Sequence, residues 1–131
     1  MDDDVKKIKE ALEKDENVIF AYLYGSYSRG KHHKFSDIDI AVFLKKYDTN
    51  AYMELFSRVP TVLKKEVDIR ILNDAPPLFK YKIIKEGNLL FVKNLEILKE
   101  FIYTTLLTAL EIREQIEDIR RRRFERILYA R

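Results

Sequence analysis

The alternation of apolar and polar positions predicts strands and helices that interleave along the chain. Apolar residues at helical spacing behind an acidic start predict a first helix over residues 4–15, with Asp4 as its N-cap. Short runs rich in β-branched and aromatic residues predict strands at residues 18–24, 36–44, 66–72 and 89–92. Further helical patterns cover residues 49–65, disturbed near Pro60, residues 77–86, opened by prolines and ended by Gly87, and residues 95–131. We therefore expect an α+β (α/β) domain in which helices flank a small mixed sheet.

Two of the expected strands carry carboxylates on one face. Asp37 and Asp39 alternate with isoleucines, so both carboxylates project from the same side of their strand. Asp68 lies at an equivalent depth on the next strand, with a parity that can match. Anions side by side repel one another, and a divalent cation relieves that repulsion. Oxygen ligands favour Mg²⁺ or Mn²⁺, so the three residues predict a two-metal site for in-line displacement at phosphorus.

A turn directly after the first strand supplies the second part of the candidate site. Gly25 lets the chain leave the strand sharply and brings backbone N–H groups close to a ligand. Ser26 adds a hydroxyl donor and caps a short helical turn. Free N–H groups and the positive end of a helix dipole form a cradle for phosphate. Ten residues separate this turn from Asp37.

The segment GSYSRGKHHKFSDIDIAVFL resembles the signature of the DNA polymerase β-type nucleotidyltransferase superfamily. The small size, the Arg29-Gly30 pair within the loop and the strand VDIRIL resemble the minimal nucleotidyltransferases. These are antitoxins encoded beside HEPN-domain proteins. The resemblance covers about residues 19–72, and it implies the polymerase β-like nucleotidyltransferase fold.

The resemblance also implies roles for the site residues. Gly25 and Ser26 would hold the β- and γ-phosphates of ATP, and Asp37 and Asp39 would bind two Mg²⁺ ions. Asp68 would bind the second ion and help activate an acceptor hydroxyl. The hydroxyl would attack the α-phosphate, and pyrophosphate would leave.

Several other polar residues could either take part in binding or simply lie at the solvated surface. Arg29 could contact the triphosphate or the acceptor, or form a surface salt bridge. Adjacent His32 and His33 point in different directions, which favours a solvated loop. The run from Arg120 to Arg123 could grip RNA but is more typical of a solvated helix face.

The final segment has neither Gly nor Pro from Leu95 onward. Some 35 residues make a helix of about 50 Å, which exceeds the diameter of a domain this small. We expect a nucleotidyltransferase core over residues 1–93 and a helical segment over residues 94–131 that packs on the core or on a partner. Phe124, Ile127 and Leu128 lie near its far end and predict a partner or self-association surface.

Composition narrows the remaining function classes. The chain has 131 residues, a formal net charge of +3, two His and no Cys. Disulfides, thiol nucleophiles, zinc–thiolate sites and iron–sulfur clusters are therefore excluded. The mild charge does not argue for nucleic-acid binding. No apolar run reaches the roughly 20 residues that span a bilayer, and the acidic start is unlike a secretory leader, so we expect a cytoplasmic domain.

The leading functional hypothesis is a Mg²⁺-dependent protein adenylyltransferase antitoxin. It would transfer AMP from ATP to a hydroxyl, expected on a tyrosine, of a cognate HEPN toxin. The same chemistry on an antibiotic or an RNA end is one alternative. A non-catalytic nucleotide-binding antitoxin that acts by contact is another.

Overall fold

Helices and strands interleave in the computed structural model, which describes residues 3–27, 37–60 and 63–129. The elements are α1 (Asp3–Lys14), β1 (Val18–Tyr24), β2 (Ile38–Leu44), α2 (Ala51–Ser57), β3 (Val67–Ile71), α3 (Pro77–Glu86), β4 (Asn88–Val92) and α4 (Leu95–Tyr129). This order confirms the expected α+β class and the predicted strands to within two residues at each end.

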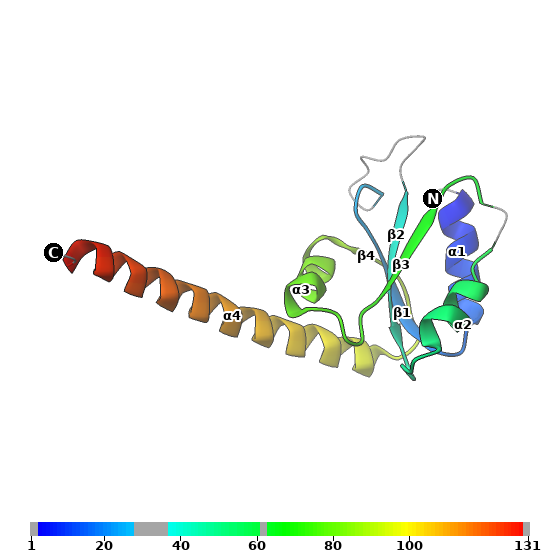
Figure 1. Cartoon of the computed structure of the whole chain (residues 1–131). Coiled ribbons are helices and arrows are strands. Elements are labelled where there is room, and N and C mark those ends of the chain that lie inside the picture. Colours follow the sequence, from blue (N-terminus) through cyan, green and yellow to red (C-terminus); the bar gives the residue numbers. More distant parts are fainter. Residues whose placement is uncertain (1–2, 28–36, 61–62, 130–131) are drawn as a thin grey trace.

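The four strands of the described residues form one mixed sheet in the order β3-β2-β1-β4. β1 is antiparallel to both β2 and β4, whereas β2 and β3 are parallel. Helices α1 and α2 cover one face of the sheet, and α3 with the first turns of α4 covers the other (Figure 1). All seven residues of β1 are buried, because the strand is central and both of its faces are covered.

Aromatic side chains fill the layer between the sheet and α4. Phe20 of β1 is fully buried, and its ring stacks on Phe43 of β2 with 5.1 Å between centroids. The ring of Phe101 on α4 lies 5.2 Å from Phe20 and 5.8 Å from Phe43. This cluster ties the start of α4 to the two central strands.

Two local predictions are wrong. The helix expected over residues 49–65 ends at Ser57, before Pro60, because proline disfavours helical backbone in the residue that precedes it. Asp4 does not cap α1, which already begins at Asp3. The buried Asp4 carboxylate instead accepts hydrogen bonds from the backbone N–H groups of Lys64 and Lys65, at 2.9 and 3.0 Å. Asp4 therefore ties α1 to the segment that leads into β3.

The last helix extends far beyond the core, as its length predicted (Figure 1). Its buried side chains are Leu98, Phe101 and Thr105, all within its first third. The segment beyond Thr105 is largely exposed to solvent. Within the described residues, no helix combines the length and the apolar character that crossing a bilayer requires.

Phe20→Ala should lower the free energy of unfolding by about 3–5 kcal/mol, because it removes a fully buried ring and leaves a cavity. Urea denaturation followed by circular dichroism measures the effect. Leu107→Ala, at an exposed position of α4, should change stability by less than about 1 kcal/mol. Equal effects of the two substitutions would contradict the assigned core.

Candidate active site

Three side chains stand in a row across neighbouring strands at one end of the sheet. Asp39 of β2 is paired with Asp68 of parallel β3 and with Tyr24 of antiparallel β1. Residues paired in this way point to the same face of a sheet. That face is the one covered by α3, because Tyr24 belongs to the apolar cluster of Ile83. Asp37 lies exposed just before β2. The predicted match between Asp39 and Asp68 is thus confirmed.

Gly25 joins the phosphate-cradle turn to these carboxylates. Its φ of +74° lies in the left-handed region, which favours glycine. A Cβ atom at this position would collide with Oδ2 of Asp39. The backbone of the turn therefore lies directly against the Asp39 carboxylate, although 14 positions separate the two residues in the sequence. Ser26, the next residue of the turn, is half-buried.

The acidic groups interact electrostatically. Burial raises the pKa of Asp39 above its usual range, and the charges of Asp68 and Asp37 raise it further. Arg70 and Lys82 act in the opposite direction without reversing the shift. Burial also raises the pKa of the Tyr24 hydroxyl, to about 12, so this group stays neutral at physiological pH. The site thus holds negative charge that the nearby cations offset only in part, beside a neutral phenol.

Arg70 and Lys82 are cationic residues at the site that sequence reasoning missed. The Nε atom of Arg70 lies 3.5 Å from Oδ2 of Asp68, and its guanidinium stacks over the ring of Phe79. Arg70 follows Asp68 by two residues, so strand alternation alone could have placed both on one face. Lys82 comes from α3, and only tertiary packing reveals that its charge reaches Asp39.

The carboxylates are suitable metal ligands but are not gathered around one point. Among the described residues, no group of three or more His, Asp or Glu side chains is placed to hold a metal ion. Asp68 instead contacts Arg70. The residues still fit a hard divalent cation, because they are all oxygen donors whose mutual repulsion is offset only in part by Arg70 and Lys82. Arg29, His32 and His33 lie outside the described residues.

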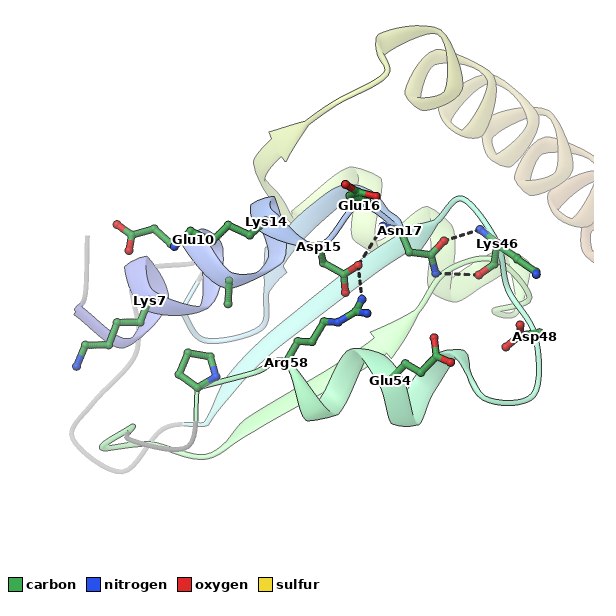
Figure 2. A pocket seen from close by; sticks show the side chains of 12 residues that line it. Lys7, Glu10, Lys14, Asp15, Glu16, Asn17, Lys46, Asp48, Glu54 and Arg58 are labelled. Carbon is green, nitrogen blue, oxygen red and sulfur yellow. Dashed lines mark hydrogen bonds and ion pairs between the residues drawn. The ribbon is translucent and has the colours of Figure 1, made fainter.

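A wide depression in the described surface lies elsewhere, between α1 and α2 (Figure 2). It has a volume of about 970 Å³ and is lined mainly by charged side chains. Its central groups are bonded to one another: Asp15 accepts from Arg58 at 2.7 Å, and the Asn17 side chain bonds both backbone groups of Lys46. These contacts give the depression a structural role, and none of the motif residues lines it.

Comparison with known proteins bears on this geometry. Residues 6–96 match the family described as "Polymerase beta, Nucleotidyltransferase". The protein adenylyltransferase MntA of Shewanella oneidensis is 37% identical over 71 residues, which are 53% of this chain and 51% of that protein. A relative in Methanocaldococcus jannaschii is 37% identical over 79 residues, which are 60% of each chain. The chain thus spans between half and two thirds of these relatives.

A solved structure shows that the likeness extends to the fold. A crystal structure of a toxin–antitoxin with AMP-PNP superimposes with a TM-score of 0.73 at 28% identity. The superposition covers 87% of this chain and 93% of the other. It therefore takes in most of the chain, well beyond the part that the family model matches.

Asp68→Asn should lower the pKa of Asp39, because it removes a neighbouring negative charge. The folded protein holds the Asp39 proton to higher pH than the unfolded chain. Ionised Asp39 therefore destabilises the free protein above its raised pKa, and this penalty disappears as the pH falls through that value. A pH titration of the Asp39 carboxyl carbon by NMR measures the shift. Asp118→Asn, far along α4, is the control, and an equal response to both substitutions would contradict the coupling.

Gly25→Ala should weaken the binding of an ATP analogue at least tenfold, because the added Cβ strains the backbone and displaces the Asp39 carboxylate. Isothermal titration calorimetry measures the affinity. Phe20→Ala serves as the control, since it destabilises the core without touching the turn. If both variants lost affinity equally, general destabilisation would explain the effect, and the assignment of the turn at Gly25 as a phosphate-binding element would be wrong.

Proposed function

The chain belongs to the polymerase β nucleotidyltransferase family, and on that premise we propose that it is a Mg²⁺-dependent protein adenylyltransferase that acts as an antitoxin. It transfers AMP from ATP to a tyrosine hydroxyl of a cognate HEPN toxin and releases pyrophosphate. One observation carries the proposal. The turn at Gly25 lies against the carboxylate of Asp39, and Asp68 stands beside Asp39 on the next strand. A phosphate cradle and paired carboxylates in contact are what nucleotidyl transfer needs.

Each side chain has a distinct task in this proposal. Backbone N–H groups at Gly25 and Ser26 hold the β- and γ-phosphates and keep the leaving group in line. Asp37, Asp39 and Asp68 would hold Mg²⁺, which when bound neutralises the triphosphate and polarises its oxygens. Arg70 and Lys82 lie on the side of the site next to α3 and add positive charge there.

The transfer itself forms one bond and breaks one. The acceptor oxygen attacks the α-phosphorus, the bond to the bridging oxygen breaks, and pyrophosphate carries away the electron pair. Asp68 is the carboxylate best placed to receive the hydroxyl proton, because about half of its side chain is exposed at the outer strand. Tyr24 keeps its own proton, because its pKa of about 12 makes it a hydrogen-bond donor rather than a competing nucleophile.

The acceptor class rests on the relatives rather than on the site. MntA carries the name protein adenylyltransferase, and the solved toxin–antitoxin binds an ATP analogue. The resemblance of the signature to minimal nucleotidyltransferases favours a HEPN toxin as the protein acceptor. A bulky nucleotide anion near the active site of a ribonuclease would repel and block its RNA substrate.

Label transfer tests the proposal. The purified chain, ATP labelled at the α-phosphate, and Mg²⁺ are incubated with a lysate of the native host. Label should appear on one protein band, be absent when the γ-phosphate carries the label, and disappear with Asp39→Asn. Asp118→Asn should transfer normally. Mass spectrometry should then find AMP on a tyrosine.

Other outcomes would contradict specific parts of the proposal. Label in RNA or in a small molecule would retain the chemistry but exclude a protein acceptor. Binding of ATP without any transfer would contradict the enzyme and favour an antitoxin that acts by contact. Toxin neutralisation that survives Asp39→Asn would support the same conclusion.

A further inference from the structure

Two buried tyrosines flank the turn that is assigned to the phosphates. Tyr24 precedes Gly25 and packs against the ring of Phe79 on α3. Tyr27 follows Ser26 and belongs to the apolar cluster under α1 and α2. Both tyrosines are 7% exposed, whereas the two residues between them are half-buried. The turn is therefore anchored on both faces of the sheet, and its backbone position depends on what holds the two rings.

One lysine side chain contacts both the hydroxyl and the ring of Tyr27. The Nζ atom of Lys65 donates a hydrogen bond to the Tyr27 hydroxyl. The same ammonium group lies 4.6 Å from the centroid of the ring. Burying a hydroxyl is unfavourable unless the group is hydrogen-bonded, so this contact stabilises one position of the ring. It adds a directional interaction that apolar packing alone does not supply.

The backbone that carries Lys65 is itself held in place. The carboxylate of Asp4 is 3% exposed and accepts hydrogen bonds from the backbone N–H groups of Lys64 and Lys65, at 2.9 and 3.0 Å. One residue further on, the carbonyl of Glu66 accepts a hydrogen bond of 2.9 Å from the N–H group of Ile38 at the start of β2. The segment before β3 is thus attached both to α1 and to the central part of the sheet.

The contact between Tyr27 and Lys65 connects two strands that are not neighbours in the sheet. β2 lies between β1 and β3. The end of β1 meets the starts of β2 and β3 at the same end of the sheet. Tyr27 lies three residues beyond the end of β1, and Lys65 lies three residues before Asp68. The contact therefore joins the phosphate-binding turn to the strand of the outer carboxylate, on the face opposite the carboxylates.

We propose that Tyr27 and Lys65 are positioning residues that fix the backbone of Gly25 and Ser26 relative to Asp68 before the nucleotide binds. This inference rests on the proposed function, because it assigns the turn to the β- and γ-phosphates. A turn that is already ordered loses less conformational entropy when a ligand binds. Nucleotidyl transfer also requires the phosphates and the carboxylates to be held in a narrow geometry. Neither side chain needs to touch the substrate, since both act through the turn.

A contact that only stabilised the fold would behave differently, and the chain offers a matched control. Arg58 contacts the Asp15 carboxylate at 2.7 Å, and the Asp15 side chain is 2% exposed. This ion pair lies on the same side of the sheet, in the depression between α1 and α2, which none of the motif residues lines. Arg58→Met should therefore lower stability without changing the affinity for nucleotide.

Isothermal titration calorimetry with AMP-PNP and Mg²⁺ tests the proposal on the full chain. Tyr27→Phe and Lys65→Met should each weaken binding about fivefold, as expected for the loss of one hydrogen bond that orders the turn. The double variant should bind no more weakly than Lys65→Met alone, because the contact is already lost. Lys65→Arg keeps a cationic donor and should retain most of the affinity. Circular dichroism verifies that each variant is folded.

Hydrogen exchange of the free protein gives a second readout that does not depend on nucleotide. The backbone N–H groups of Gly25 and Ser26 should exchange faster in Tyr27→Phe and Lys65→Met than in the wild type or in Arg58→Met. Unchanged exchange, or AMP-PNP affinities equal to that of the wild type, would overturn the proposal. A wild type that binds no AMP-PNP would instead contradict the proposed function, and the exchange rates would then decide the positioning role by themselves.

Discussion

The parallel pairing of β2 with β3 is the contact on which the candidate site depends. It brings Asp39 and Asp68 to the same level of the sheet, while the antiparallel pairing with β1 adds Tyr24 and the turn at Gly25. Burial raises the pKa of Asp39 above its usual range, and repulsion from the neighbouring charge of Asp68 raises it further. The apolar residues of the same strands, which pack under α1 and α2, hold the carboxylates in place. Core packing thus offsets the electrostatic penalty of the site.

Much of this arrangement follows from local sequence pattern. The alternation of side chains along a strand placed Asp39 and Asp68 on the faces opposite their apolar neighbours, and Gly25 marked the turn. Both signals depend only on residues close together in the sequence. The helix expected up to residue 65 was too long. The apolar spacing continues beyond Ser57, but Val59 and Leu63 pack against the apolar core under α1 and α2 from backbone that is not helical. Asp4 was predicted to be a cap from its position at the start of the helix. Its actual partners are backbone N–H groups about 60 residues away, and a contact of that range leaves no signal in the local sequence.

Tertiary contacts account for what the pattern could not predict. The charge of Lys82 reaches Asp39 only because α3 packs on the same face as the carboxylates, and Arg70 is held by Phe79 of that helix. α3 therefore borders two features of the chain: Phe79 and Lys82 lie at the site, whereas Leu78 and Tyr81 border the groove along α4.

The most direct test of the central claim is a crystal structure with Mn²⁺ and a non-hydrolysable ATP analogue. Mn²⁺ substitutes for Mg²⁺ and can be located by its anomalous scattering. The account predicts anomalous density within about 2.3 Å of carboxylate oxygens of Asp37, Asp39 and Asp68, with the β- and γ-phosphates on the backbone of Gly25 and Ser26. Mn²⁺ and nucleotide bound away from these residues, for example in the depression between α1 and α2, would contradict it.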